Sequence, residues 1–111
     1  MWTDSAKTTW VEVGTGSHLA AYTVSLSPST HVPQLVAQWN IATGATSPLV
    51  AGGVLYTVGG SSLRAYNPST GALLWTGATG SIHWQSPVVD GGTVLVEDGS
   101  GHLTAWRLPG T

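Results

Sequence analysis

Short runs of alternating apolar and polar residues recur along the whole chain, and each run predicts a β-strand. In one of them, Val54, Tyr56 and Val58 would point to one face of the strand. Leu55 and Thr57 would point to the other face. No window shows the 3, 4, 7 spacing of an amphipathic helix, so the pattern predicts an all-β fold. Ten strands are expected, near residues 9–14, 18–23, 34–40, 47–51, 53–58, 62–67, 72–77, 86–89, 93–98 and 102–107.

Pairs that contain glycine or proline stand between the runs and supply the turns of an antiparallel sheet. Gly52-Gly53 and Gly59-Gly60 tolerate the positive φ angles of tight hairpins, and Pro68 fixes its own φ. The chain holds 15 glycines and 6 prolines without a collagen-like period, and 41% of its residues are apolar. This composition favours a turn-rich β domain with a buried core over a disordered chain.

The strand pattern repeats with a period near 40 residues. Ser47–Gly53 reads SPLVAGG, and Ser86–Gly92 reads SPVVDGG 39 positions later. Trp10–Tyr22 is a fainter upstream copy of Val54–Tyr66. With the strands of a repeat labelled A to D, the ten runs read B-C-D, A-B-C-D and A-B-C. The repeat therefore predicts a degenerate unit at about 9–46, a complete unit at about 47–85 and an incomplete unit at about 86–107.

The first unit carries eight extra residues. Tyr22 and Trp39 are 17 positions apart, whereas the equivalent Tyr66 and Trp75 are 9 apart. Prolines at 28 and 33 flank the excess and are poorly suited to the middle of a sheet. We therefore expect a long surface loop at Ser27–Gln34 and no additional strand.

The segment Ala65–Trp75 reads AYNPSTGALLW. It resembles the tryptophan-docking motif of pyrroloquinoline-quinone-type (quinoprotein-like) β-propeller repeats, in which an Ala, an Asp or Asn, a Thr-Gly pair and a Trp follow at fixed spacing. The resemblance covers about residues 9–107, and in the first unit Trp39 matches the motif while His31 replaces its glycine. The matching residues of the middle unit are Ala65, Asn67, Thr70, Gly71 and Trp75.

The resemblance implies a partial β-propeller of four-stranded antiparallel blades, with one complete blade flanked by two incomplete ones. It also implies that Trp39 and Trp75 each pack flat between neighbouring blades as structural docking residues. Tryptophan suits this role because its ring buries a large apolar surface and its indole N–H needs one acceptor. If Trp75 is buried in this way, Trp75→Ala should cost about 3 to 5 kcal/mol of stability.

Charge is scarce, since only 8 of the 111 residues are Lys, Arg, Asp or Glu. The chain therefore offers no basic patch for nucleic-acid phosphates and no polybasic segment for a membrane surface. We expect no nucleic-acid partner and no membrane insertion by this segment. There is no cysteine, which removes disulfides, thiolate nucleophiles and cysteine-ligated zinc together.

Catalytic chemistry finds little support in the remaining residues. Quinoprotein dehydrogenases, which share this type of repeat, bind calcium and a quinone among acidic and amide side chains. The five acids here form no recognisable calcium-and-base arrangement, and Asp90 and Asp98 fit turn positions beside glycines. His18 and His102 fall at the same hairpin of different units, too far apart to share a metal. We expect no catalytic residue, no cofactor and no metal site.

A candidate contact loop is formed by His83 and Trp84, in the connection between the second and third units. In propellers such connections cross one face and contribute to binding. The other connection that blade packing explains poorly is Ser27–Gln34. We expect a protein partner to touch these two segments.

These observations predict a non-catalytic protein-interaction scaffold or sensor domain. Two and a half blades cannot close a ring, because propellers have about 4 to 8, so a protein partner or self-association must complete it. An extracytoplasmic location is implied by the resemblance alone, since the N-terminal residues show no signal-peptide pattern. Two alternatives stay open. One is a small carbohydrate-binding propeller lectin that closes by homo-oligomerisation, with Trp2 and Trp84 as unassigned aromatics; the other is a fragment of a quinone-dependent dehydrogenase.

Overall fold

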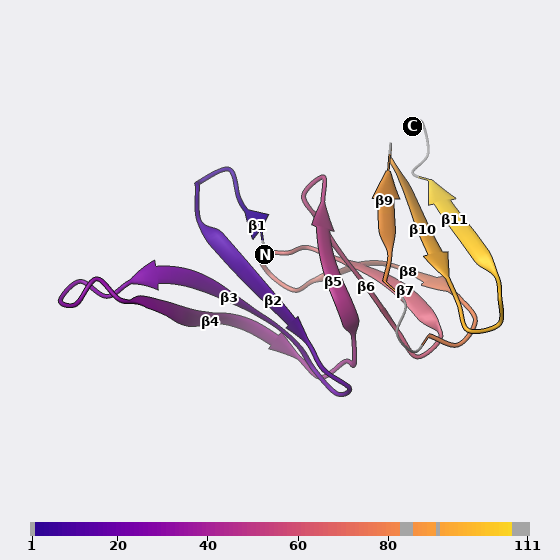
Figure 1. The fold of residues 1–111 in the computed structure, drawn as a ribbon, viewed down its shortest axis with the longest axis horizontal. Coiled ribbons are helices and arrows are strands. Elements are labelled where there is room, and N and C mark those ends of the chain that lie inside the picture. The colour runs from indigo at the N-terminus through magenta and orange to yellow at the C-terminus, as the bar shows by residue number, and fades with distance from the viewer. Residues whose placement is uncertain (1, 83–85, 91, 108–111) are drawn as a thin grey trace.

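The computed structural model describes residues 2–82, 86–90 and 92–107. They form eleven β-strands in three antiparallel sheets, which follow one another along the chain (Figure 1). Nowhere in these ranges is there a helix long and apolar enough to cross a membrane.

The first sheet consists, in spatial order, of β1 (Trp2–Thr3), β2 (Thr9–Gly14), β3 (Leu19–Leu26) and β4 (Pro33–Ile41). The second sheet consists of β5 (Thr46–Ala51), β6 (Val54–Gly59), β7 (Ser62–Tyr66) and β8 (Leu73–Ala78). The third sheet consists of β9 (Val88–Asp90), β10 (Thr93–Glu97) and β11 (Leu103–Arg107).

The predicted all-β fold is confirmed, and each of the ten predicted strands overlaps an observed one. The strand that was not predicted is β1, whose two residues are too few to show alternation. Trp2 lies opposite Trp10, and Thr3 opposite Thr9, in an antiparallel ladder. The first sheet therefore has four strands where the sequence pattern predicted three.

The three sheets stand side by side in chain order and form an open row (Figure 1). The radius of gyration is 15.0 Å, whereas a compact domain of this length would have roughly 13 Å. The longest axis measures 52 Å and the shortest 19 Å. This shape is that of a fragment of a propeller, with a sheet at each end that has a neighbour on one side only.

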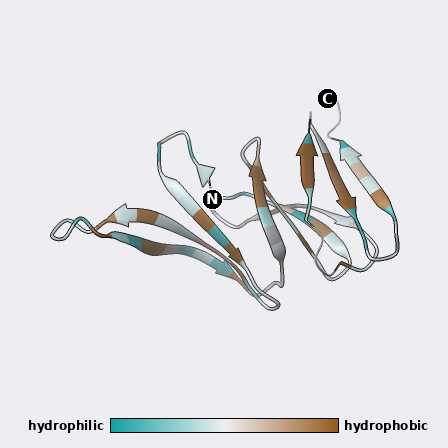
Figure 2. Ribbon diagram, viewed as in Figure 1, coloured by the Kyte–Doolittle hydropathy of each residue, from teal (hydrophilic) through white to brown (hydrophobic). Residues whose placement is uncertain are grey.

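Two apolar clusters join neighbouring sheets. The cluster between the first and second sheets contains Leu19, Ala45, Leu55 and Tyr66. The cluster between the second and third sheets contains Val58, Leu63, Ile82, Val94 and Val96. Leu55 and Val58 thus leave β6 on opposite faces, as the alternation predicted, and both are fully buried. Figure 2 shows apolar residues concentrated on β9 and β10; Val94 and Val96 of β10 belong to this second cluster, and Val89 of β9 packs against it.

The extra residues of the first unit lengthen two strands, so the loop predicted at Ser27–Gln34 was wrong. β3 has eight residues and β4 nine, against five in β7 and six in β8. Only residues 27–32 lie between the two strands, and the added length forms a β-ribbon that projects beyond the rest of the sheet (Figure 1). The proline argument failed because Pro28 lies in the turn and Pro33 begins β4, where a missing N–H is tolerated.

The turn at 27–32 has the same construction as the turn at 67–72 in the second sheet. In both, the first residue donates its N–H to the carbonyl of the sixth, and the fifth donates to the carbonyl of the first. These distances are 2.9 Å in the first sheet and 2.8 Å in the second. The fifth residue is left-handed in both turns, with φ of +58° at His31 and +76° at Gly71. His31 therefore adopts the conformation for which the motif normally uses glycine.

Candidate functional site

Trp39 of β4 lies on the turn that joins β7 and β8. Its indole N–H donates to the carbonyl oxygen of Pro68 at 2.9 Å. A Cβ atom added at Gly71 would stand 2.8 Å from two carbons of the Trp39 ring, so the ring lies directly against this glycine. The contact joins the first sheet to the second across 29 positions of the chain.

Asn67 and Thr70 shape the turn that receives Trp39. The Asn67 side-chain oxygen accepts the N–H of Ser69 at 2.9 Å, and the Thr70 hydroxyl accepts the N–H of Ala72 at 3.3 Å. Such local side-chain bonds favour turn conformations over a continued strand. Both residues therefore act on the turn, and the ring of Trp39 meets the backbone that they hold.

Trp75 has a different environment from Trp39, although both lie opposite an alanine at the same bulge of their sheets. It is 40% exposed, where a buried ring was expected. Its ring meets Trp106 edge to face, with centroids 5.8 Å apart, and its indole N–H finds no acceptor in the described part of the chain. The turn that would receive it in the third unit would follow β11, beyond the described residues. Its alanine neighbour Ala65 is buried.

The polar residues singled out in the sequence do not form a common site. His83 and Trp84 lie outside the described residues. His18 and His102 are both exposed and belong to turns of different sheets. Within the described ranges, no group of three or more His, Asp or Glu residues could hold a metal ion.

Trp2 and Trp10 are stacked, with ring centroids 6.1 Å apart and planes at 19°. The Trp2 indole N–H donates to Glu12 at 2.5 Å, and that of Trp10 donates to Asp4 at 2.9 Å. The bonds from the Trp10 indole and the Thr8 N–H lower the pKa of Asp4, whereas burial raises the pKa of Glu12 despite the bond from Trp2. Trp2 therefore has a structural role within the first sheet.

Asp98 joins the third sheet to the connection that precedes it. Its buried carboxylate accepts backbone N–H groups from Gly80 at 2.8 Å, Ser100 at 2.9 Å and His102 at 3.1 Å. Burial by itself would raise the pKa of Asp98, but these three bonds and the nearby His102 imidazole outweigh it and lower the pKa. The turn position predicted for Asp98 is present, and its side chain also reaches the neighbouring unit.

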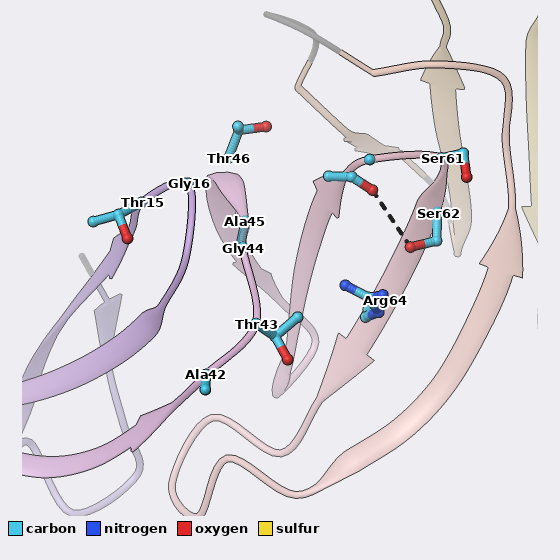
Figure 3. Close-up of a pocket in the computed structure, with 12 residues that line it drawn as sticks. Thr15, Gly16, Ala42, Thr43, Gly44, Ala45, Thr46, Ser61, Ser62 and Arg64 are labelled. Atoms are coloured by element: carbon cyan, nitrogen blue, oxygen red, sulfur yellow. Dashed lines mark hydrogen bonds between the residues drawn. The ribbon is translucent and has the colours of Figure 1, made fainter.

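A cavity of about 590 Å³ opens between the first and second sheets, at the place that corresponds to the Asp98 contact between the second and third sheets (Figure 3). The turn between β2 and β3, the connection from β4 to β5 and the turn between β6 and β7 form its walls. Among the residues that line it, Arg64 of β7 alone is charged. Its other polar walls include Thr15, Thr43, Gly44, Gly60 and Ser62.

Arg64 lies opposite Thr57 across the ladder, on the face of the second sheet that is directed towards the first. In the described part of the chain, no carboxylate lies within ion-pair distance of its guanidinium. Leu55 and Tyr66 pack in the apolar cluster on this same face. The cavity is therefore the polar end of the interface between the first and second sheets. The arrangement presents a positive charge, hydroxyl groups and turn backbone to the cavity.

The sequence pattern did not predict that Arg64 lines a cavity or that the Asp98 side chain binds the backbone of Gly80. A signal for Arg64 was present in the repeat, because Ala20 and Thr104 occupy the equivalent positions of the other units. A charged residue at one of three equivalent positions cannot be explained by the shared fold. For Asp98, the bond to Gly80 spans 18 positions and follows no local pattern.

The family model described as "Outer membrane protein assembly factor BamB" matches residues 2–108, which include all three sheets. A search of the curated proteins finds no match. The resemblance inferred from the docking motif is thereby confirmed, and the chain belongs to this family of quinoprotein-like β-propeller repeats.

Proposed function

We propose that the chain is a non-catalytic, protein-binding module of a β-propeller that requires further blades to cover its two outer faces. The observation that carries this proposal is the difference between two equivalent leucines. Leu63 on β7 is fully buried against the third sheet, whereas Leu103 on β11 is 70% exposed. The two leucines occupy equivalent positions at the start of the third strand of their repeat, Leu63 as the second residue of β7 and Leu103 as the first residue of β11, so a neighbouring sheet would be expected to cover Leu103 as well.

The rest of the outer face of the third sheet supports the same conclusion. Val88 lies opposite Leu95 in the ladder and is 56% exposed. β11 is also an edge strand, with no described strand on its outer side. Exposed apolar side chains and an open edge together promote association, since both are stabilised when another sheet packs on them. A further blade would cover this face, and a fourth strand of the third sheet would complete the turn after β11 that Trp75 lacks.

The family description supports a role in protein assembly. It names an outer-membrane protein assembly factor, and a propeller of this kind would offer its turns and connections to other proteins. We propose the same setting for this chain, with an extracytoplasmic location and protein partners. His83 and Trp84 remain the proposed contact loop.

Light scattering tests the proposal directly. The chain has a mass of 11.4 kDa, and we expect a solution mass that is a multiple of this value or a stable complex with other blades. Leu103→Glu should reduce the mass to that of one chain, while Ser100→Glu in the adjacent exposed turn serves as the charge-matched control. A monodisperse single chain that binds no blade or partner would contradict the proposal.

Enzymatic activity is tested separately by adding quinone and calcium to the protein. We expect neither a saturable change in absorbance nor a rise in the unfolding temperature. Either response would favour a fragment of a quinone-dependent dehydrogenase over the scaffold.

One observation favours the carbohydrate-binding alternative. A second cavity of about 160 Å³ is lined by Tyr22, Gln38, Trp39 and Asn40, a mixture of aromatic and amide groups that suits a sugar. A glycan array decides the matter. Binding that Gln38→Ala and Asn40→Ala both remove would establish the lectin function, and an array without hits would dismiss it.

A further inference from the structure

We propose that the cavity between the first and second sheets binds a carboxylate group, with Arg64 as the residue that holds it. The inference extends the proposed function, on which it rests only for the source of the carboxylate, an acidic side chain of a partner protein. The binding chemistry follows from the comparison of two equivalent interfaces in the same chain.

The interface between the second and third sheets already contains a carboxylate. The Asp98 side chain enters from the turn between β10 and β11 and accepts the N–H of Gly80 in the preceding connection. It also accepts two N–H groups of its own turn. The group thereby links a turn of one sheet to the connection from the sheet before it.

The interface between the first and second sheets lacks this carboxylate. The pair Leu49–Tyr56 in the second sheet is equivalent to the pair Val88–Leu95 in the third. Gly59 lies three residues after Tyr56, and Asp98 lies three residues after Leu95, so Gly59 is the equivalent of Asp98. Gly59 has no side chain to enter the interface. The cavity lies at this place, and Gly59 is one of the residues that line it.

The donors that a carboxylate would need are nevertheless present. Two backbone hydrogen bonds mark equivalent points of the two connections. The N–H of Ala45 donates to the carbonyl oxygen of Thr15 at 2.9 Å, and the N–H of Ile82 donates to the carbonyl oxygen of Gly60 at 2.8 Å. Thr43 stands two residues before Ala45, and Gly80 stands two residues before Ile82, so these two residues are equivalent. The N–H of Gly80 is bonded to Asp98, whereas within the described residues the N–H of Thr43 donates no hydrogen bond.

Arg64 adds a positive charge to the cavity, and the other interface has no positively charged residue at the equivalent position. The equivalent residue of the third sheet is Thr104, opposite Val96 as Arg64 is opposite Thr57. A guanidinium is the side chain best suited to grip a carboxylate, because it offers several N–H donors in a fixed plane. Figure 3 shows Arg64, Thr43 and Ser62 around the same space. An external carboxylate would therefore find both a charge and an unused backbone donor.

Binding can be measured on the whole chain by following its backbone amide and arginine side-chain NMR signals during titration. The probes are a tripeptide Gly-Asp-Gly with both ends blocked, the same peptide with Asn in place of Asp, acetate and inorganic phosphate. We expect the Asp peptide and acetate to shift the signals of Thr43, Gly60 and Arg64, and the Asn peptide to leave them unchanged. Added salt should weaken the effect because charge attraction is screened.

The acetate and Asp-peptide arms also identify the source of the group. Stronger binding of the Asp peptide than of acetate supports an acidic side chain of a partner protein. Acetate binding without Asp-peptide binding overturns that source and leaves a small organic acid as the ligand. Phosphate binding tighter than both carboxylates overturns the assignment of the ligand class.

Variants identify the residue responsible. Arg64→Gln should weaken binding about tenfold, the loss of one charge-assisted contact, and Arg64→Lys should retain part of it. Arg107→Gln is the matched control, because it removes the same charge from an exposed residue of β11 that does not line the cavity. Full binding by Arg64→Gln would overturn the proposal.

A second variant, Thr15→Asp, places a carboxylate of the protein itself in the cavity. The Thr15 hydroxyl accepts the N–H groups of Ser17 and His18, as the Asp98 carboxylate accepts those of Ser100 and His102. Thr15→Asp therefore preserves the turn and places a negative charge on the cavity wall. We expect it to abolish peptide binding while Thr15→Asn does not; equal binding by both would contradict the site. Neither result depends on the mass measured by light scattering, so this proposal and the propeller module can fail independently.

Discussion

The indole N–H of Trp39 in the first sheet donates a hydrogen bond to the carbonyl oxygen of Pro68 in the second, across 2.9 Å. Pro68 is buried and sits in the turn whose glycine supports the Trp39 ring. The bond satisfies the one polar atom of a large apolar side chain. Trp39 therefore fixes both the distance and the orientation between two neighbouring sheets.

Replacing Trp39 should destabilise the fold in two separable steps. Trp39→Phe keeps an aromatic ring but leaves the Pro68 carbonyl without its donor, which should cost about 1 kcal/mol. Trp39→Ala also removes the ring, and the loss should reach about 3 kcal/mol. Urea unfolding followed by circular dichroism measures both values.

Trp75→Ala is the control for this comparison, because Trp75 is the same residue type at the equivalent position of the next sheet. It is 40% exposed, so its truncation should cost less than about 2 kcal/mol in the isolated chain. This replaces the larger value that the sequence pattern predicted for a buried ring. Equal losses for the two tryptophans would show that Trp39 does not owe its effect to the turn.

Gly71→Ala tests the close approach between the turn and the Trp39 ring. Gly71 and Gly53 share a φ of +76°, but a Cβ at Gly53 would meet nothing within 4 Å. Gly53→Ala should therefore cost only the backbone strain, about 1 to 2 kcal/mol. Gly71→Ala should cost at least about 1 kcal/mol more, because the new methyl group overlaps the indole.

A double-mutant cycle shows whether that difference comes from Trp39. In the Trp39→Ala background, the cost of Gly71→Ala should fall to that of Gly53→Ala, as expected when two residues are in contact. Unfolding free energies of the four proteins suffice. An unchanged cost in that background would place the clash elsewhere.

Much of this fold could be read from the sequence because its signals are local. The alternation around Val58 predicted a strand in which Leu55 and Val58 point to opposite faces, and the two side chains are buried on opposite sides. The Gly52-Gly53 pair predicted a tight turn with positive φ angles, and both glycines have them, +57° and +76°. Period-two patterns and turn residues act over a few positions, so they need no knowledge of the neighbouring sheets.

The contacts between sheets could not be read in this way. Asp98 reaches Gly80, and Arg64 faces a cavity formed by three separate segments. Such relationships depend on how the sheets are placed, which the local pattern does not encode. The prolines of the first unit misled for a related reason, since their effect depends on their place in the ladder: Pro33 begins β4.

Leu63 and Leu103 provide a test of which faces are covered in the isolated chain. Leu63 is fully buried between the second and third sheets, so Leu63→Ala should cost about 2 to 5 kcal/mol. Leu103→Ala should change the unfolding free energy of a single chain by less than about 0.5 kcal/mol, because its side chain is 70% exposed. The measurement is urea unfolding at a concentration low enough to prevent association.

The ranking should change once further blades are present. Association would bury Leu103, and the same substitution would then weaken the complex, seen as a concentration-dependent fall in its unfolding temperature. An effect of Leu103→Ala that is equally large at every concentration would mean that the residue is already buried within one chain.

The Asp98 carboxylate makes the stability of the interface between the second and third sheets dependent on pH. Burial would raise its pKa, but the N–H groups of His102, Gly80 and Ser100 outweigh burial, and the pKa lies below its ordinary value. An acid with a lower pKa in the folded state stabilises the fold above its unfolded pKa, near about 4. That stabilisation is lost as the pH falls through the folded pKa.

Asp98→Asn should therefore lower the urea midpoint at neutral pH, because a neutral amide has one acceptor oxygen, whereas the carboxylate uses two to accept the three N–H groups. The difference from the original protein should shrink as the pH falls below about 4, where the carboxylate becomes protonated. Asp4, whose pKa is also lowered by its hydrogen bonds, leaves a residual acid sensitivity in the variant. Asp90→Asn is the matched control, since Asp90 is exposed on β9 and should show no such pattern. A midpoint difference that stays constant from neutral pH to below the carboxylate pKa would mean that the charge of Asp98 does not stabilise the interface, and that only its shape does.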